Sequence, residues 1–169
     1  MIIGNGDIAT ALREIPKQTE RKNWIYFASG VSNSQEKRES EYEREIKLLL
    51  KQDKNKHLVY ISSLCVFYSN SRYAKHKKQM EKLIKDNFER FTIMRFGTIT
   101  WGNNPHTLIN FFRYQKKRGK KLTIRDTYRY IVDKDEFLHW IRLIPDWDCE
   151  MNVTGKRMKV KEIVRKYVK

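Results

Sequence analysis

The sequence predicts an α/β protein with a mostly parallel sheet and helices on both faces of the sheet. Short apolar segments alternate along the chain with longer amphipathic ones, which is the pattern of strands joined by crossover helices. A glycine-containing turn stands between the first apolar segment and the first helical one. The chain has 169 residues, so we expect one compact unit. Within it, residues 1–118 form the body and residues 119–169 a small C-terminal part.

Each element is expected from its own local pattern. Strands are expected where apolar and β-branched residues form short runs, at residues 1–3, 24–28, 58–62, 91–96, 121–125, 128–132 and 151–153. Helices are expected where apolar residues recur every three or four positions, at residues 7–15, 36–54, 73–86, 107–118, 134–143 and 159–167. Ligands of parallel sheets bind beyond the carboxyl ends of the strands, so the residues that follow strands are the candidates for a site.

Composition and charge narrow the function classes. The chain has 36 Lys and Arg against 20 Asp and Glu, a net charge of +16. Such a field attracts nucleic acid, anionic membrane surfaces or phosphorylated small molecules. A lysine-rich source proteome gives the same net charge with no such partner, so charge alone selects no function. The two cysteines, Cys65 and Cys149, are far apart, which excludes a disulfide framework or a zinc ribbon.

Targeting and metal-binding patterns are not found in the sequence. No apolar run approaches the ~18–20 residues of a membrane-spanning helix, and the first residues lack the pattern of a secretory signal. We therefore expect a cytoplasmic protein without a membrane anchor. The four histidines are scattered, with no second ligand at the spacing of a metal site, so no metal is expected.

The first candidate site is the turn with the sequence Gly-Asn-Gly-Asp-Ile-Ala. Glycines allow a tight turn and a close approach of the backbone to a pyrophosphate, and alanine at the third position allows close packing of helix on strand. A plain tight turn is the alternative interpretation. The residues of this turn are Gly4, Asn5, Gly6, Asp7, Ile8 and Ala9.

The second candidate is the pair Tyr73 and Lys77. Residues four apart share a face of a helix, and a nearby ammonium lowers the pKa of a phenol and makes it a usable acid and base. The spacing itself has no weight, because about one such pair is expected by chance, and Tyr130 with Lys134 is a second example. The preceding segment supports a catalytic interpretation of this pair, because an apolar strand ends in Ser62-Ser63, ten residues before Tyr73. Ordinary turn chemistry is the alternative for the serines.

Taken in order, these motifs resemble the short-chain dehydrogenase/reductase superfamily, in its extended branch of NAD-dependent epimerases and dehydratases. The resemblance runs along nearly the whole chain. Its segments are the glycine turn, Phe-Ala-Ser-Gly-Val-Ser at 27–32, Val-Tyr-Ile-Ser-Ser at 59–63, Tyr73 with Lys77, Met-Arg-Phe-Gly-Thr at 94–98 with Trp-Gly at 101–102, Arg-Tyr-Ile-Val-Asp at 129–133, and Met-Asn-Val-Thr-Gly at 151–155.

The resemblance implies a Rossmann-like fold and a role for each matching residue. Tyr73 would be the catalytic acid and base, Lys77 would lower its pKa and bind the nicotinamide ribose, and Ser63 would orient the substrate. The implied cofactor is NAD or NADP, held by the six residues of the turn, by Lys77, and by Ala28, Ser29 and Gly30. The implied substrate is a nucleotide-linked or phosphorylated sugar, in contact with Ser62, Ser63, Thr98 and Arg129.

The sequence also departs from the family pattern. Only 14 residues separate Ala9 from Trp24, too few for the second and third strands that normally hold the adenosine half of the cofactor. The acidic residue expected near position 24 is absent, and Arg129 lies one position late, with Tyr128 in the usual place of the arginine. The segment 1–3 would then lie at a sheet edge, and an open edge favours association, so we expect a homodimer.

Three functions therefore stay open on the sequence. The first is an NAD(P)-dependent sugar epimerase, dehydratase or reductase that works by hydride transfer. The second is an inactive descendant of the family that acts as a binding or scaffolding module. The third is a basic nucleic-acid-binding protein, since clusters such as residues 116–121 and the many aromatic residues are suited to phosphate contacts and base stacking.

Overall fold

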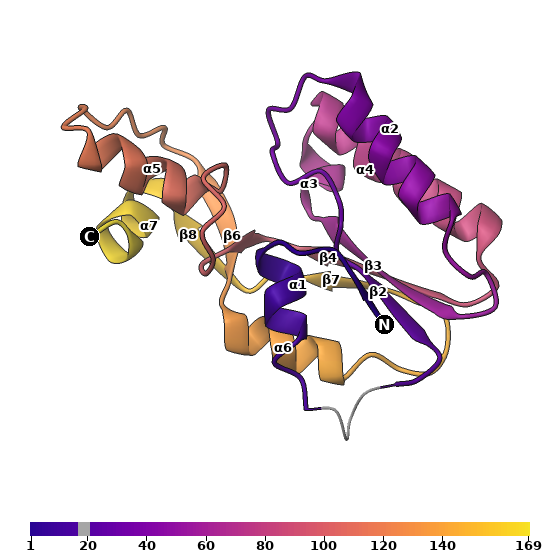
Figure 1. Ribbon diagram of the computed structural model, residues 1–169. Coiled ribbons are helices and arrows are strands. Elements are labelled where there is room, and N and C mark those ends of the chain that lie inside the picture. Colours follow the sequence, from indigo (N-terminus) through magenta and orange to yellow (C-terminus); the bar gives the residue numbers. More distant parts are fainter. Residues whose placement is uncertain (17–20) are drawn as a thin grey trace.

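A five-stranded parallel sheet forms the centre of the molecule (Figure 1). The structure is a computed structural model and describes residues 1–16 and 21–169. The strands lie in the order β1 (Ile2–Ile3), β2 (Trp24–Phe27), β3 (His57–Ser63), β4 (Phe91–Phe96) and β7 (Cys149–Val153). Each neighbouring pair runs parallel. The expected α/β fold is confirmed.

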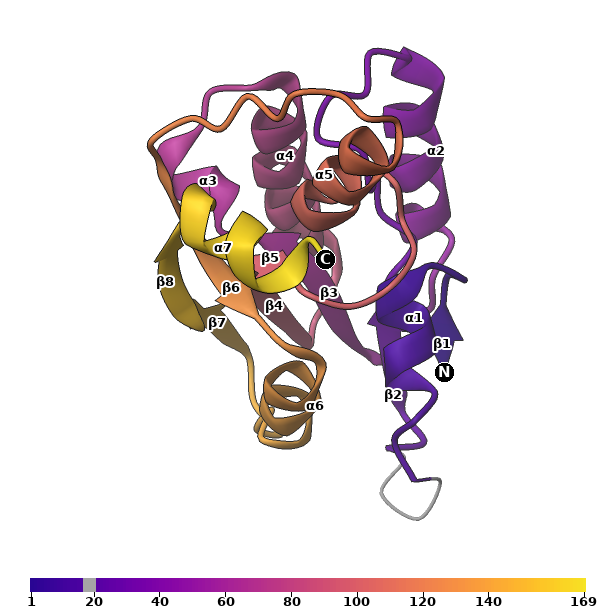
Figure 2. The ribbon, with the colours of Figure 1, turned by 90° about the vertical axis from the view of Figure 1, so that its left-hand side faces the viewer.

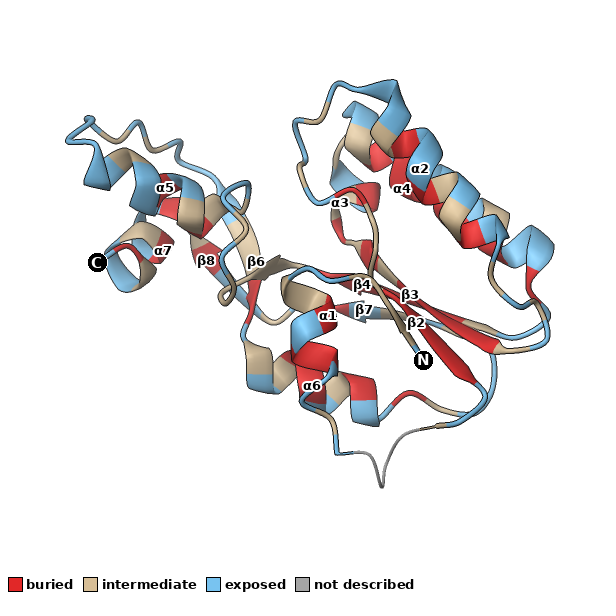
Figure 3. Ribbon diagram, viewed as in Figure 1, coloured by how far each residue is buried: buried red, intermediate tan, exposed pale blue. Residues whose placement is uncertain are grey.

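Helices cover both faces of this sheet (Figures 1 and 3). On one face lie α2 (Glu39–Leu50) and α4 (Arg72–Asn87), and on the other lie α1 (Asp7–Leu12) and α6 (Lys134–Arg142). The strands supply both cores because successive side chains point to opposite faces. In β2, Ile25 packs with the α2–α4 core, whereas the next residue, Tyr26, packs with the α1–α6 core.

A second, smaller sheet lies to one side of the first (Figures 1 and 2). Its central strand β6 (Tyr128–Val132) pairs in parallel with β5 (Thr98–Ile99) and antiparallel with β8 (Lys156–Lys159). Helices α5 (Leu108–Lys117) and α7 (Val160–Tyr167) pack together with these strands around a third apolar core. In the sequence, the expected boundary after Arg118 comes directly after α5. Strand β7, which belongs to the expected C-terminal part, lies in the main sheet.

The second sheet contains the main departures from the predicted elements. The strand expected at residues 121–125 is irregular chain, because β5 and β8 already occupy both edges of β6. Strand β8 was not expected, since Met158 is its only apolar residue. The short elements β5 and α3 (Cys65–Tyr68) were also not expected. Helices α1 and α2 are shorter than predicted, and residues 17–20 of the chain lie outside the described residues.

The order of strands places β1 at one edge of the main sheet in the described part of the chain. In the described residues between α1 and β2 no strand occurs, so β1 pairs directly with β2. The edge position expected for the first strand is confirmed. Among the described residues, no helix combines the length and apolar character that crossing a membrane requires.

Candidate functional site

The predicted site residues gather where the strands of the main sheet end. Gly4 and Gly6 follow β1, Ala28 and Gly30 follow β2, and Ser63 ends β3. Because neighbouring strands are parallel, their carboxyl ends meet at one edge of the sheet. Helix α4 begins close to this edge, since only the single turn of α3 separates it from β3.

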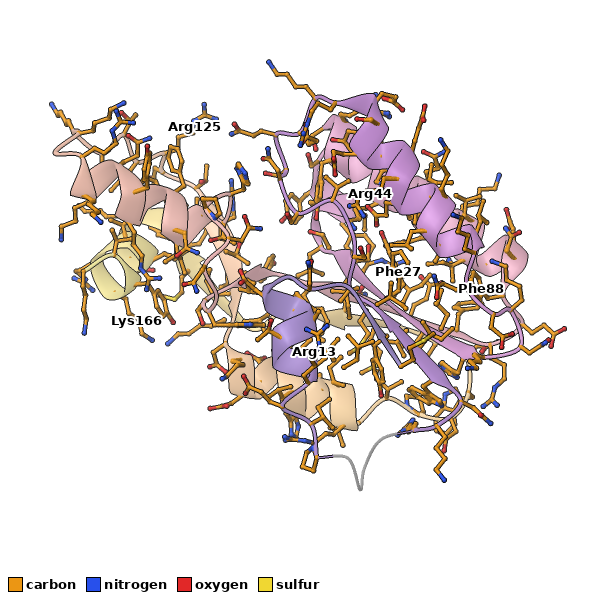
Figure 4. The ribbon with its side chains drawn as sticks, viewed as in Figure 1. Arg13, Phe27, Arg44, Phe88, Arg125 and Lys166 are labelled. Carbon is orange, nitrogen blue, oxygen red and sulfur yellow. The ribbon has the colours of Figure 1, made fainter. Side chains whose placement is uncertain are left out.

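The glycine turn is tight and lies directly against the loop that follows β2. Gly4 has a φ of 122°, and a β-carbon there would lie 2.5 Å from the carbonyl oxygen of Ala28. Arg13, labelled in Figure 4, donates a hydrogen bond of 2.6 Å to the carbonyl oxygen of Gly4. Gly6 is exposed, and a β-carbon there would meet no atom within 4 Å. Glycine is therefore required for packing at position 4, while the space above position 6 is open.

The other residues of the turn contribute to packing and to a loop contact. Ala9 is fully buried and Ile8 packs against the α1–α6 core, whereas Asn5 is exposed. The carboxylate of Asp7 accepts hydrogen bonds of 3.0 Å from the backbone N–H groups of Asn103 and Asn104. The start of the short helix α1 is thus fixed to the loop at residues 101–104.

Gly30 brings the loop after β2 against Lys77. A β-carbon at Gly30 would lie 2.6 Å from the Lys77 Nζ and 2.9 Å from the Glu45 Oε1. The backbone N–H of the next residue, Val31, donates a 2.7 Å hydrogen bond to Glu45. In the same loop, Arg44 donates to the hydroxyl and the carbonyl oxygen of Ser29, both at 3.3 Å; its position is labelled in Figure 4.

Lys77 belongs to a buried hydrogen-bonded cluster centred on Glu45. The Lys77 ammonium donates to Glu45 Oε1 at 3.0 Å and to the Tyr60 hydroxyl at 2.9 Å. The Tyr60 hydroxyl donates to the same carboxylate at 2.8 Å, and His76 Nε2 lies 3.0 Å from its other oxygen. Lys77 is 2% exposed and Glu45 is fully buried. We call Glu45, Tyr60, His76 and Lys77 the Glu45 cluster.

The Glu45 cluster holds a charged pair in the interior. Burial by itself raises the pKa of Glu45, but the Lys77 charge and the hydrogen bonds from His76 and Val31 outweigh it and lower the pKa below its usual value. Burial, followed by the negative charge of Glu45, raises the pKa of Tyr60. Glu45 therefore stays ionised and Tyr60 stays neutral at physiological pH.

Tyr73 stands in the first turn of α4, where the Ser71 hydroxyl caps the helix by accepting a hydrogen bond from Ala74. The Tyr73 ring is half-buried, and its centroid lies 5.7 Å from the Lys77 Nζ. Burial, with smaller contributions from Cys65 and Glu45, raises the pKa of Tyr73. The sequence predicts a lowered pKa for Tyr73. The difference arises because burial of the phenol dominates, and Lys77 directs its ammonium to Glu45 and Tyr60.

The two serines at the end of β3 have different surroundings. Ser63 is half-buried, and its hydroxyl accepts a 3.3 Å hydrogen bond from the backbone N–H of Cys65. Ser62 is buried and donates to Glu81 at 2.5 Å, within an ion-pair network that contains Arg95. The structure thus places Ser63, Tyr73 and Lys77 near one another. Ser62 instead binds Glu81 in the ion-pair network with Arg95.

The two remaining predicted substrate residues lie in the second sheet. Thr98 begins β5 and pairs with Ile131 of β6, and its side chain is half-buried. Arg129 is on β6, where its guanidinium donates a 2.9 Å hydrogen bond to the Tyr128 carbonyl oxygen. Burial raises the pKa of Tyr68, and the positive charge of Arg129 opposes this rise. Arg129 therefore lies close to the end of α3.

A shallow hollow adjoins Gly30 on the outer side of the Glu45 cluster. It has a volume of about 130 Å³. Charged side chains line it: Arg38 and Arg44 form ion pairs with Glu41, and His106 contributes from the loop before α5. The residues that line this hollow are Gly30, Val31, Ser32, Asn33, Glu36, Arg38, Glu41, Arg44 and His106.

The residues present fit only one half of a dinucleotide. The open space above Gly6, and the gathering of Ser63, Tyr73 and Lys77 at the same sheet edge, fit a diphosphate and a nicotinamide. The adenosine half has no support in the described residues, because no strand lies beyond β1. Glu45 is the residue that sequence reasoning missed. Its signal was present, as an acid between Tyr42 and Leu49 on the buried face of α2.

Comparison with known proteins shows similarity in fold only. No family model matches the chain, and no curated protein matches it. Solved structures do match. The enzyme WbmH of Bordetella bronchiseptica in complex with NAD+ gives a TM-score of 0.66 at 13% identity, over 94% of this chain and 61% of that chain. WbmG of the same organism, in complex with NAD and UDP, gives a TM-score of 0.63 at 14% identity, over 94% of this chain and 59% of that chain.

A third match is the UDP-glucose 4-epimerase of Thermus thermophilus in complex with NAD. It gives a TM-score of 0.59 at 15% identity, over 94% of this chain and 64% of that chain. The chain thus spans about 60% of the length of such enzymes. At these identities the likeness shows the fold. It confirms the expected resemblance to a shortened form of the extended short-chain dehydrogenase/reductase fold.

Proposed function

We propose that this chain binds a nicotinamide cofactor together with a nucleotide-linked or phosphorylated sugar, and that Tyr73 exchanges a proton with the sugar. The observation that carries this proposal is the gathering of Tyr73, Lys77 and Ser63 at the carboxyl edge of the sheet, beside the glycine turn. The similar structures contain NAD, and one also contains UDP. The nicotinamide, when bound, would give a hydride to the sugar carbon or take one from it.

Tyr73 is protonated at neutral pH and so holds the proton that the acid direction of this chemistry requires. A phenol that stays protonated at neutral pH is suited to donate a proton to a carbonyl oxygen as that oxygen gains negative charge. The phenol then loses its O–H bond and becomes a phenolate, which the nearby Lys77 charge stabilises. We take the reduction of a ketosugar to an alcohol as the reaction to test.

The neighbouring groups would position the substrate and cofactor. The Ser63 hydroxyl, at the end of β3, is placed to hold the same oxygen that receives the proton from Tyr73. Gly6 would leave room for the diphosphate, whereas the absence of a side chain at Gly30 lets the loop after β2 approach Lys77 and Glu45. To bind that ribose, Lys77 would have to exchange part of its bond with Glu45 for one with the ligand.

The second candidate function is a binding module without catalysis. The Glu45 cluster favours it, because Lys77 donates to Glu45 and Tyr60 and is 2% exposed. In this case the fold would hold a phosphorylated ligand without hydride transfer. The two functions differ in whether NADH is bound and consumed.

The first experiment is a fluorescence titration with NADH in the presence of UDP. We expect saturable binding by the wild-type chain and at least a tenfold loss in Gly6→Asp, because an aspartate would place negative charge where the diphosphate is expected. Gly6→Ser is the matched control. Both side chains are good helix N-caps, so both variants should fold, but only the aspartate repels an anion. Equal binding by both variants would contradict the proposed diphosphate position.

The second experiment measures turnover of NADH with nucleotide-linked ketosugars. We expect Tyr73→Phe to lower the rate about 10²–10⁴-fold, the range typical for loss of a general acid. Tyr130→Phe, in the other Tyr-x-x-x-Lys pair, is the control and should keep the wild-type rate. An unchanged rate in Tyr73→Phe would refute the catalytic assignment, and saturable ligand binding without turnover would favour the binding module.

A homodimer remains part of this proposal. Strand β1 lies at an open sheet edge in the described residues, and the outer faces of α2 and α4 are available for pairing. Sedimentation at several protein concentrations would show the dimer as a species of twice the monomer mass, and a monomer at all concentrations would exclude it.

A further inference from the structure

The positive charge of this protein is concentrated in one lobe. We define the basic lobe as residues 107–130 and 154–169, which contain α5, most of β6, and all of β8 and α7. It has 15 Lys and Arg against 2 Asp and Glu, a net charge of +13. The remaining 129 residues have 21 Lys and Arg against 18 Asp and Glu, or +3. A lysine-rich composition would spread its charge over the whole chain, so it does not explain this distribution.

The cations of the basic lobe are exposed and have few acidic partners. Thirteen of the 15 are exposed: Arg113, Lys116, Lys117, Arg118, Lys120, Lys121, Arg125, Lys156, Arg157, Lys161, Arg165, Lys166 and Lys169. Within the described part of the chain, the only ion pair that the lobe's cations form joins Lys159 to Asp126. Figure 4 labels Arg125 near α5 and Lys166 near α7, both with side chains directed outward. These charges remain available for a polyanion.

Exposed aromatic rings lie among these cations. On α5, Phe111 and Tyr114 are three positions apart and are 48% and 53% exposed, so they share one outer face of the helix. At the start of β6, Tyr128 is 45% exposed. Arg157 lies 3.9 Å from the Tyr128 ring centroid, and Arg118 lies 5.4 Å from that of Tyr114. Flat rings beside guanidinium groups are suited to stack on bases while the cations contact phosphates.

We propose that the basic lobe binds single-stranded nucleic acid, with phosphates held by its lysines and arginines and bases stacked on Phe111, Tyr114 and Tyr128. A single strand is favoured over a duplex because base faces are free for stacking only when they are unpaired. This interaction uses neither Tyr73, Lys77 nor Ser63, and of the predicted substrate residues the lobe contains only Arg129, which is not among its exposed cations. It therefore does not depend on the function proposed above.

The structure favours nucleic acid over an anionic membrane. Helix α7 is strongly amphipathic, which is the pattern of a helix that lies on a bilayer. Its apolar residues Val160 and Ile163 are buried, however, in the core that also contains Ile109 and Phe112 of α5. The apolar face of α7 is thus used inside the lobe and is not free to enter lipid.

The test is fluorescence anisotropy with a labelled 20-nucleotide oligo-dT at several salt concentrations. The lobe-charge variant combines Lys117→Gln, Lys120→Gln and Lys121→Gln. The body-charge variant combines Lys51→Gln, Lys75→Gln and Lys82→Gln, three exposed lysines on or next to α2 and α4. Both variants have the same net charge, so a difference between them reports the position of the charge.

We expect the lobe-charge variant to bind at least tenfold more weakly than wild type. The slope of log K against log salt should fall in magnitude by about 2, because each lost phosphate contact on a single strand contributes about 0.7. The body-charge variant should stay within about twofold of wild type. Equal weakening of both variants, or an unchanged slope in the lobe-charge variant, would overturn the proposal.

The contribution of stacking is tested separately. Phe111→Ala combined with Tyr114→Ala should weaken oligo-dT binding about fivefold or more. Trp147→Ala, which removes an aromatic side chain that is 70% exposed in the body, should have no effect. A 20-base-pair duplex and vesicles that contain anionic phospholipid complete the set. If either is bound as tightly as oligo-dT while the aromatic variant equals wild type, the proposal of single-strand recognition is wrong.

Discussion

The body, meaning the residues outside the basic lobe, and the basic lobe differ in how their charged side chains are paired and buried. In the body, cations meet nearly as many acids, and several pairs are buried, such as Lys77 with Glu45 and Arg95 with Glu81. In the lobe, cations outnumber acids by 15 to 2, and thirteen of the 15 cations are exposed to solvent. A buried charge needs a partner because desolvation is costly, whereas an exposed charge does not. The charges of the body therefore maintain its structure, and those of the lobe are free to bind.

The largest expected effect comes from breaking the buried pair in the body. We expect Lys77→Ala to lower the free energy of unfolding by about 3–5 kcal/mol, because it leaves the Glu45 carboxylate buried without its cation. Lys120→Ala, in the lobe, should change stability by less than about 0.5 kcal/mol, since this side chain is exposed and in no ion pair with the described residues. Denaturant unfolding measures both.

A double variant sharpens this comparison. Glu45→Gln with Lys77→Met removes both charges and keeps similar volumes, so it should be less destabilised than Lys77→Ala alone. A double variant as unstable as the single one would mean that lost packing, and not an unpaired charge, causes the effect. If Lys77→Ala were as stable as wild type, the Glu45 cluster would have no structural role.

The second expected effect is a pH dependence that arises in the body. His57 is buried, its ring stacks on Trp24, and its Nε2 lies 2.7 Å from the Thr92 hydroxyl. Burial, and then the positive charge of Arg90, lowers the pKa of His57 to about 4. The unfolded chain binds this proton near pH 6.5 and the folded chain only near pH 4, so stability should fall as the pH drops through this window. The loss should reach about 3 kcal/mol.

Urea unfolding at pH 7.5 and at pH 4.5 checks this expectation. In His57→Gln the slope of stability against pH between these values should be reduced, whereas His106→Gln, at an exposed position, should keep the wild-type slope. Identical slopes in His57→Gln and wild type would show that His57 does not titrate in this window.

The smallest expected effect concerns the stability of the lobe-charge variant. Removing three like charges from a surface of +13 should leave the unfolding free energy unchanged or raise it by a few tenths of a kcal/mol. Added salt should stabilise the wild type more than this variant, because salt screens the repulsion. Thermal unfolding at low and high salt measures the difference, and a clear destabilisation of the variant would mean that these lysines have structural partners.

Much of the body could be predicted from the sequence because its signals are local. The apolar run at residues 91–96 became β4 with the same bounds, and the turn at Gly4 and Gly6 lies between a strand and a helix as expected. The short distance between Ala9 and Trp24 predicted that two strands would be missing; no strand occurs there in the described residues, and β1 lies at an edge of the sheet that they form.

The interactions that decide the chemistry could not be predicted from the sequence, because they join residues that are far apart along the chain. The pairing of Glu45 with Lys77 spans 32 residues, and no periodic pattern specifies it. Burial of the Tyr73 phenol, with a smaller contribution from Glu45, raises its pKa, against the expectation from Lys77 alone. Likewise, β8 has a single buried apolar residue, Met158, and forms because β6 offers it an edge. The concentration of charge in the lobe became visible only when α5, β8 and α7 were seen together.

The central claim is that the two regions bind different anionic ligands independently. The most direct measurement is a crossed titration, in which Gly6→Asp and the lobe-charge variant are each titrated with NADH and with oligo-dT. The account predicts that Gly6→Asp loses NADH binding and keeps oligo-dT binding, and that the lobe-charge variant does the reverse. Loss of both ligands in either variant would contradict it.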